Sequence, residues 1–392
     1  MQKISFDNIQ NAFEYKTDSE INRAYWLFKA ISNNTLVKAG PSLVDLALKL
    51  HLPISGIVKA TLFKHFCGGE DIDECYETVE QLARFNVGSI LDYSVEGKES
   101  EPEFDHSANE ILATVNRARG DAHISFCVFK VTGLARFALL EKVSAKQTLD
   151  ANEQQEYAKV QQRVKNICET AFNNNVPIFV DAEESWIQPA IDQLATDMMM
   201  LYNKERVIVY NTLQFYRHDR LEFLKQSYQH AVDNGYLLGE KLVRGAYMEK
   251  ERKRAAEQGY PSPIQPDKAA SDRDYDAGLV FCINHINHIA FCAGTHNAES
   301  SMGLVHLMQK AQITPTDKRI YFSQLLGMSD HISFNLAKAG YNVCKYVPYG
   351  PVKAVLPYLM RRAQENTSIS GQMGREVSLL SQERKRRKAE KI

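Results

Sequence analysis

Short apolar stretches, rich in β-branched and aromatic residues, recur eight times along the chain from residue 87 onward. The segments between them are mainly helical in pattern or polar. This alternation predicts a parallel sheet, and eight repeats favour a closed (β/α)8 barrel, with an open doubly wound sheet as the alternative. The expected strands are 87–94, 123–130, 176–183, 206–213, 237–247, 288–297, 319–327 and 342–350.

The first part of the chain has helical patterns instead. Apolar residues recur at helical spacing after Asp18, a typical capping residue, and Pro41 and Pro53 begin two further helical segments. We therefore expect an α/β protein in which a helical arm precedes the barrel. The predicted division is an N-terminal arm over 1–66, a catalytic barrel over 67–370 and a basic C-terminal tail over 371–392.

Polar residues of both signs gather where the expected strands end, which is where a (β/α)8 barrel carries its chemistry. Cations there face an acidic group, an arrangement that suits a small zwitterion or an anionic ligand. Lysines at strand ends also leave a Schiff-base lyase of the aldolase kind open. The residues are Lys130, Asp181, Glu183, Glu184, Asn211 to Gln214, Lys241, Arg244, Tyr247, Thr295, His296, Asn297, Ser323, Gln324 and Tyr346.

Composition narrows the class of protein. The chain of 392 residues is 44% hydrophobic with a net charge of −1, so it can bury a sizeable core and is not expected to bind nucleic acid. Its seven cysteines are scattered without a C-x-x-C motif, as expected for reduced thiols. No apolar run reaches the roughly 18 residues of a membrane helix. The amino terminus also has no signal-peptide core or transit pattern, so we expect a cytoplasmic protein.

Several common cofactor motifs are missing from the sequence. His285 and His288 lie three residues apart, but no third ligand follows at a characteristic spacing, so no metal site is expected. Neither a phosphate-binding G-x-x-x-x-G-K-[ST] loop nor a G-x-S-x-G elbow is present, and no G-x-G-x-x-G follows a strand. A nucleotide cofactor would therefore have to bind at the top of the barrel.

Two charged segments allow more than one interpretation. Residues 249–276 predict either a solvated helix and loop or a cover over the active site, because they follow the polar end of the fifth strand. The basic run 382–392 predicts a solvated helix end, disorder, or loose peripheral attachment to the anionic inner face of the cell membrane.

A helix with adjacent arginines is expected over 351–366, beginning at Pro351, with an apolar stripe at i, i+3, i+4 and i+7. At about 100° per residue, Arg361 lies almost opposite this stripe and Arg362 lies to one side. Glu365 would then pair with Arg361 at a solvated helix end. The competing interpretation is an anion clamp, because a planar guanidinium matches a carboxylate.

Four stretches together resemble one family. KLVRGAYM (241–248), FVDAEES (179–185), GTHN (294–297) and YVPYG…YLMRRAQEN (346–366) resemble proline dehydrogenase, and the similarity extends over about residues 60–370. The chain looks most like the monofunctional branch that includes the eukaryotic enzymes. The resemblance implies a distorted (β/α)8 barrel that uses FAD to oxidise L-proline to Δ1-pyrroline-5-carboxylate, passes electrons to a membrane quinone, and has its last helix across the barrel top.

The resemblance also implies roles for individual residues. The substrate carboxylate is expected to bind Arg361, Arg362 and Lys130. The proline pocket is expected to include Asp181, Tyr247, Tyr346, Ala246 and Leu325. The residues expected to contact FAD are Gln214, Arg244, Gly245, Thr295, His296, Asn297 and Glu365.

Two positions refine this expectation. Lys241 stands where bifunctional relatives carry an arginine near the flavin N5, so the donor charge is kept without the planar fork. Relatives that act on 4-hydroxyproline tend to have a smaller residue at the position of Tyr346, so the tyrosine favours proline. A 4-hydroxyproline dehydrogenase is the alternative within the family.

Overall fold

The computed structural model describes residues 4–32, 55–95, 98–368 and 372–390. The helical segment expected after Pro41 lies outside these residues.

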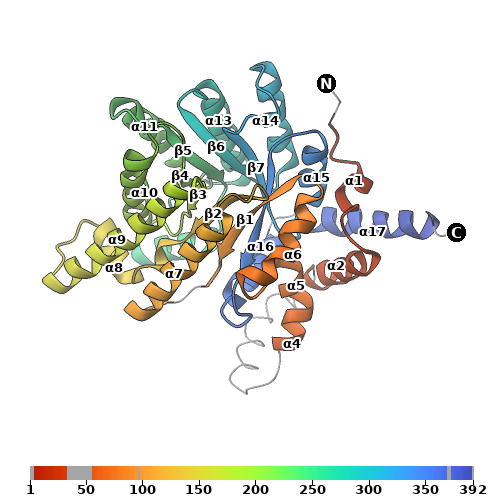
Figure 1. Ribbon diagram of the computed structural model, residues 1–392, viewed down its shortest axis with the longest axis horizontal. Coiled ribbons are helices and arrows are strands. Elements are labelled where there is room, and N and C mark those ends of the chain that lie inside the picture. Colours follow the sequence, from red (N-terminus) through yellow and green to blue (C-terminus); the bar gives the residue numbers. More distant parts are fainter. Residues whose placement is uncertain (1–3, 33–54, 96–97, 369–371, 391–392) are drawn as a thin grey trace. The chain divides into compact units, whose positions relative to one another are not determined.

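Eight strands follow one another in chain order around a closed barrel, which confirms the predicted fold class and excludes the open sheet (Figure 1). Every predicted strand is present, because short runs of β-branched and aromatic residues suit strands buried on both faces. The strands are β1 (Val87–Tyr93), β2 (Ile124–Phe129), β3 (Ile178–Val180), β4 (Val209–Gln214), β5 (Leu238–Val243), β6 (Ile289–Gly294), β7 (Ile320–Leu325) and β8 (Val343–Tyr349).

The chain forms two compact units. The first contains residues 1–89, 94–96 and 324–392, and the second contains residues 90–93 and 97–323.

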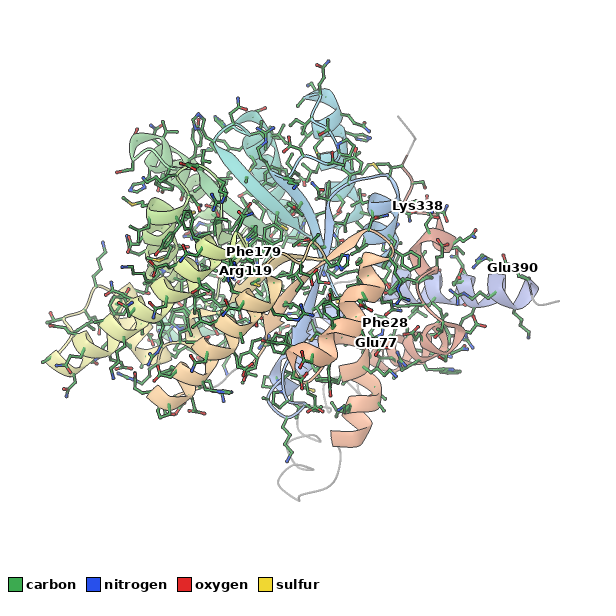
Figure 2. The ribbon with its side chains drawn as sticks, in the orientation of Figure 1. Phe28, Glu77, Arg119, Phe179, Lys338 and Glu390 are labelled. Carbon is green, nitrogen blue, oxygen red and sulfur yellow. The ribbon has the colours of Figure 1, made fainter. Side chains whose placement is uncertain are left out.

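The second unit contains β2 to β6 with their helices. Strands β2 to β7 pair in parallel, so that Thr212 of β4 and Cys292 of β6 both lie beside Lys241 of β5. The ring of Phe179 (Figure 2) stacks on the ring of Phe126 with 4.3 Å between the ring centres, which links β3 to β2. The helices are α7 (Glu101–Ala118), α8 (Phe137–Ser144), α9 (Ala151–Asn174), α10 (Gln188–Tyr202), α11 (Arg220–Asp233), α12 (Met248–Gln258), α13 (Lys268–Asn284) and α14 (Ala298–Lys310), with a short 3-10 turn at Val131–Gly133.

The first unit packs helices from both ends of the chain into one apolar core. Phe28 (Figure 2) lies in this core with Val355, with Leu359 of α16 and with Leu380 of α17. Its helical elements are α1 (Ile9–Phe13), α2 (Asp18–Ile31), α4 (Ser55–Val58), a π-helical turn (Lys59–Phe63), α5 (Lys64–Phe66), α6 (Ile72–Ala83), α15 (Asp330–Lys338), α16 (Leu356–Ser368) and α17 (Gln372–Glu390).

The start of α16 differs from the prediction. The helix begins at Leu356, whereas Pro351 begins a turn in which the Ala354 N–H donates to the Pro351 carbonyl at 2.8 Å. The apolar stripe is nevertheless real, because Val352, Val355 and Leu359 are buried in the core. Periodicity therefore identified the buried face and misplaced the first residue of the helix.

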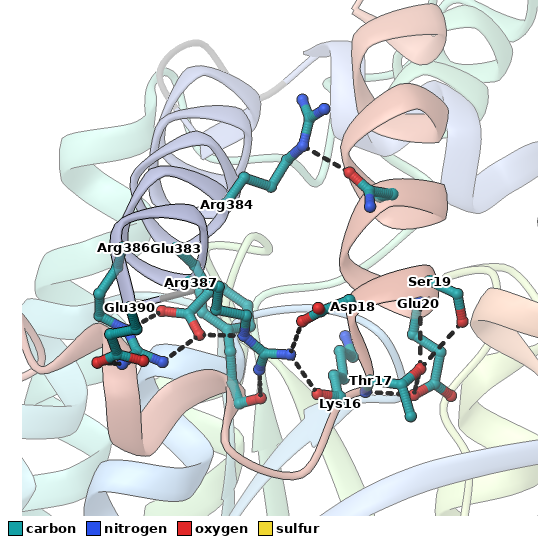
Figure 3. A network of polar contacts seen from close by, with 12 residues as sticks. Lys16, Thr17, Asp18, Ser19, Glu20, Glu383, Arg384, Arg386, Arg387 and Glu390 are labelled. Atoms are coloured by element: carbon teal, nitrogen blue, oxygen red, sulfur yellow. Dashed lines mark hydrogen bonds and ion pairs between the residues drawn. The ribbon is translucent and has the colours of Figure 1, made fainter. Parts of the chain in front are cut away.

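Residues 382–390 of the basic C-terminal run form the end of helix α17, which packs beside α2 (Figure 3). Arg384 Nε donates to Asn22 Oδ1 at 2.7 Å, and Arg387 NH1 donates to Asp18 Oδ1 at 2.9 Å. Arg387 Nε also donates to the buried Glu383 at 2.6 Å. Two arginines of the basic run, Arg384 and Arg387, therefore have hydrogen-bond partners within the first unit.

Candidate active site

The carboxyl ends of β2, β3 and β5 bring together three of the predicted site residues of the second unit. Lys130 directly follows β2, Asp181 directly follows β3, and Lys241 lies within β5. The buried Lys241 ammonium forms an ion pair with Asp181 and lies 4.9 Å from the centre of the Phe179 ring. This ion pair links strand β5 to the turn after β3.

Glu183 fastens the turn after β3 to the turn after β2. The Thr132 N–H and hydroxyl donate to its two carboxyl oxygens at 3.1 and 2.5 Å. Burial raises the pKa of Glu183 to about 7, although the bonds from Thr132 and the charge of Lys130 oppose this change. The two turns that carry Lys130 and Asp181 are therefore fixed to each other.

The buried carboxylate of Asp192 links the turn after β3 to strand β4. Asp192 of α10 accepts hydrogen bonds from Gln188 Nε2 at 2.8 Å, Asn211 Nδ2 at 2.9 Å and Arg220 NH1 at 2.8 Å. Gln188 in turn accepts from the Glu183 N–H at 2.8 Å. The sequence analysis missed Asp192 and Arg220, because nothing in a helical pattern distinguishes a buried polar residue from a solvated one.

The ends of β5 and β6 form a second polar group, around Arg244. Its Nε donates to Asp272 at 2.7 Å, its NH1 to the Thr295 hydroxyl at 2.8 Å and its NH2 to the Ser300 hydroxyl at 2.9 Å. The Thr295 hydroxyl also accepts from the Asn297 N–H at 3.0 Å. The structure therefore brings Arg244 together with the GTHN turn, which contains His296, and adds Asp272 and Ser300 to the predicted residues.

Glycine is required at position 245. Gly245 has φ +124°, and an added Cβ would lie 2.4 Å from the Tyr216 ring. This close approach turns the chain from β5 into the half-buried residues Ala246 and Tyr247, and Tyr247 precedes α12. The RGAY stretch is thus shaped by backbone geometry as well as by its side chains.

The end of β4 offers an acceptor that suits a bound group. Gln214 is buried, and within the described part of the chain its Oε1 atom has no hydrogen-bond partner. A buried amide oxygen that makes no hydrogen bond costs about 1–3 kcal/mol, which a donor on a cofactor would recover. An isoalloxazine ring has an N–H donor, and Arg244 supplies positive charge for a pyrophosphate. These residues fit a flavin dinucleotide.

The described residues contain no cluster of three or more side chains able to ligate a metal ion. They also contain no helix with the length and apolar character needed to cross a bilayer.

The remaining predicted site residues lie in the first unit. Leu325 ends β7, Tyr346 is buried on β8, and Arg361 and Arg362 are half-buried on α16. The Arg362 guanidinium lies 5.2 Å from the centre of the Tyr358 ring. Arg361 is therefore less exposed than its position opposite the apolar stripe suggested. The side chain of Glu365, its expected partner, lies outside the described residues.

The segment 249–276 forms α12, a connecting loop and the start of α13. Glu251 on α12 is fully buried and accepts from the Ser185 N–H and hydroxyl, both at 2.6 Å. Lys250 pairs with Glu184, and the Arg254 guanidinium lies 4.4 Å from the centre of the Trp186 ring. Helix α12 is thus fastened to the turn after β3 and is not freely solvated.

Known proteins resemble this chain over most of its length. The family model described as proline dehydrogenase matches residues 75–375. The carbapenem antibiotics biosynthesis protein CarD of Pectobacterium carotovorum subsp. carotovorum is 34% identical over 323 residues, covering 82% of this chain and 83% of that protein. Proline dehydrogenase 1, mitochondrial, of Dictyostelium discoideum is 32% identical over 418 residues, covering 95% of this chain and 73% of that protein.

A solved structure shares the fold. Proline utilization A (PutA) from Bdellovibrio bacteriovorus, inactivated by N-propargylglycine, matches with a TM-score of 0.76 at 20% identity. The match covers 96% of this chain and 42% of the PutA chain, so this chain spans less than half the length of that protein.

Proposed function

Because the chain belongs to the proline dehydrogenase family, we propose that it oxidises L-proline to Δ1-pyrroline-5-carboxylate with FAD as hydride acceptor. The observation that carries this proposal is the strand-end group of Asp181, Lys241, Arg244 and Gln214, which lies within the stretch that the family model matches. It combines an ion pair, a fixed guanidinium and a buried acceptor at the end of the barrel strands.

In this proposal the chain acts chiefly by orienting proline. The carboxylate is bound by Arg361, Arg362 and Lys130, since guanidinium groups pair with carboxylates through two parallel hydrogen bonds. Such a clamp would hold the proline ring in one orientation, which removes orientational entropy from the barrier. The residues that line the pocket are Asp181, Tyr247, Tyr346, Ala246 and Leu325.

A second set of residues holds the cofactor, which supplies the two-electron oxidation when bound. Gln214 would accept a hydrogen bond at Oε1, and Lys241, which pairs with Asp181, would lie near the ring. Arg244, whose NH1 donates to the Thr295 hydroxyl, would contact the phosphates. The full proposed set is Gln214, Lys241, Arg244, Gly245, Thr295, His296, Asn297 and Glu365.

The proposed electron acceptor is a membrane quinone, which requires a cytoplasmic enzyme to touch the bilayer at times. The surface that supports this is on α2, where Trp26 is 57% exposed and has the Lys29 ammonium 5.0 Å from its ring centre. An exposed tryptophan flanked by basic groups suits an anionic interface. Co-sedimentation with vesicles that contain anionic lipid, lost in Trp26→Ala, is the expected result.

The test of the function is anaerobic titration of the purified flavoprotein. Proline should bleach the long-wavelength flavin band, and 4-hydroxyproline should do so less efficiently because of Tyr346. Colourless protein that borohydride links covalently to a keto substrate would establish the lyase instead.

A substitution of Arg361 tests the proposed binding of the substrate carboxylate. Arg361→Met should raise the KM for proline by an amount equivalent to roughly 2–5 kcal/mol, because a buried carboxylate loses a charged partner, while FAD stays bound. Arg84→Met, which removes an exposed arginine directly after α6, is the matched control. Unchanged proline kinetics in the Arg361 variant would contradict the proposed carboxylate binding by this arginine.

A further inference from the structure

A cluster of buried charges lies at the turn that follows β7, within the first unit. Lys345 of β8 is fully buried, and Asp330, the first residue of α15, is 2% exposed. The Lys345 Nζ atom lies 2.9 Å from Asp330 Oδ1, and Lys16 Nζ donates to Oδ2 of the same carboxylate at 2.6 Å. The Tyr15 hydroxyl donates to that oxygen at 2.8 Å.

The three donors of the Lys345 ammonium all have partners. Besides Asp330, the ammonium donates to the Met328 carbonyl at 2.5 Å and approaches the Leu325 carbonyl at 3.3 Å. Burying ions costs several kcal/mol each in desolvation, so a buried ion pair adds little net stability compared with apolar packing. The geometry instead specifies one conformation of the turn from Leu325 to Asp330.

This turn supports the pocket residues that the first unit contributes. Leu325 begins it, and the Leu326 N–H donates to the Tyr346 carbonyl at 2.9 Å. Lys345 and Tyr346 are neighbours on β8, so their side chains point to opposite faces of the strand. The Met328 side chain packs in the core with Leu359 of α16, the helix that carries the two arginines of the clamp.

Residues from near both ends of the sequence also contact the turn from Leu325 to Asp330. Lys16 and Tyr15 come from the connection between α1 and α2. From α17, the buried Glu376 accepts a hydrogen bond from the Ser329 N–H at 2.8 Å. Ser329 has a left-handed backbone with φ 52°, which a side chain adopts only at some cost, so the hydrogen bond helps to keep it there.

We propose that Lys345 is a positioning residue for the substrate pocket. By binding the carbonyls of Leu325 and Met328 together with Asp330, its ammonium fixes the turn on which Leu325, Tyr346 and α16 depend. Lys345 itself touches neither substrate nor cofactor. This inference rests on the proposed function, because the pocket residues are those assigned above.

The test compares Lys345→Met with Lys338→Met, which removes an exposed lysine from α15 outside the cluster. Lys345→Met should raise both the KM for proline and the Kd of a non-oxidisable five-membered cyclic ether carboxylate by on the order of 10- to 100-fold, since a misplacement of about 1 Å can cost about a hundredfold. Bound FAD per protein should not change, and Lys345→Arg, which keeps the charge, should recover part of the affinity. Lys338→Met should behave as the wild type.

The possible results test the proposed function and the positioning role of Lys345 separately. A wild type whose flavin stays oxidised with proline overturns the proposed function. An active wild type together with a folded Lys345→Met variant of unchanged KM and Kd overturns the positioning role alone. Should Lys345→Met fail to fold, Lys16→Met replaces it, because Lys16 binds the other oxygen of Asp330. That variant should weaken analogue binding in the same direction but less, and unchanged binding would again overturn the inference.

Discussion

Glu376 should make the stability of the enzyme fall as the pH rises from about 4.5 to about 7. The side chain is buried on α17, and burial raises its pKa from 4.5 to about 7, with a smaller contribution from Asp330. The Ser329 N–H, Lys345 and Lys16 oppose this change. His331 Nδ1 lies 4.0 Å away, and burial lowers its pKa to about 4, so this ring stays neutral across most of the window.

The direction follows from proton binding. Between pH 4.5 and 7 the folded protein keeps the Glu376 proton while the unfolded chain has released it, so raising the pH favours the unfolded state. The contribution is complete below pH 4.5 and is lost as the pH passes about 7. With about 1.4 kcal/mol for each pH unit between 4.5 and about 7, the loss amounts to roughly 3 kcal/mol.

The perturbation is Glu376→Gln, which keeps an oxygen acceptor for the Ser329 N–H and removes the titration. Urea unfolding followed by circular dichroism at pH 5, 6, 7 and 8 gives the free energy of unfolding at each pH. The wild type should lose stability relative to the variant as the pH rises, so that the variant is the more stable protein at pH 8. Glu390→Gln, which changes an exposed carboxylate on the same helix, is the control.

Two outcomes would refute this reasoning. If the variant and the wild type lose stability in parallel from pH 5 to 8, Glu376 does not hold a proton in the folded state. If Glu390→Gln changes the slope as much as Glu376→Gln does, the effect comes from the overall charge of α17 and not from burial.

Three further predictions concern the second unit and the thiols. Gly245→Ala should destabilise the fold by roughly 1–3 kcal/mol and lower bound FAD, because its Cβ would overlap the Tyr216 ring; unfolding midpoints and flavin absorbance per protein measure both. Glu240→Gln should gain stability over the wild type in urea unfolding as the pH rises above 4.5, because burial raises the pKa of Glu240 and neither carboxyl oxygen has a hydrogen-bond partner among the described residues. The thiols should react with a maleimide only after unfolding, because all seven are buried and burial raises the pKa of Cys127 and Cys168.

The sequence predicted the barrel well because its strands are short and buried on both faces. A run such as HISFCVFK has few alternatives to a strand, and eight such runs separated by helices leave few topologies. The apolar stripe of α16 was equally clear. The first residue of that helix was not, because proline suits both a turn and a first helical position.

Buried charges are what the sequence did not predict. Lys345 lies in the run NVCKYVPYG, and its partner Asp330 lies 15 positions away in the chain. Lys16, which pairs with the same carboxylate, lies 329 positions from Lys345. Periodicity treats a lysine as a solvated residue, and only the fold shows which lysine has a carboxylate and two carbonyls around it. Asp192 and Glu251 were missed for the same reason.

The packing of α17 on α2 also has a consequence for the order of events during synthesis. Phe28 belongs to a core that is completed by Leu379 and Leu380, residues near the other end of the chain. At about 5–20 residues per second, a ribosome needs roughly 20–70 seconds to pass from one to the other. During that time the apolar face of α2 lacks its final cover. Helix α2 is therefore expected to reach native packing only after α17 has been synthesised, and a chaperone that binds exposed apolar helices would have its longest opportunity there.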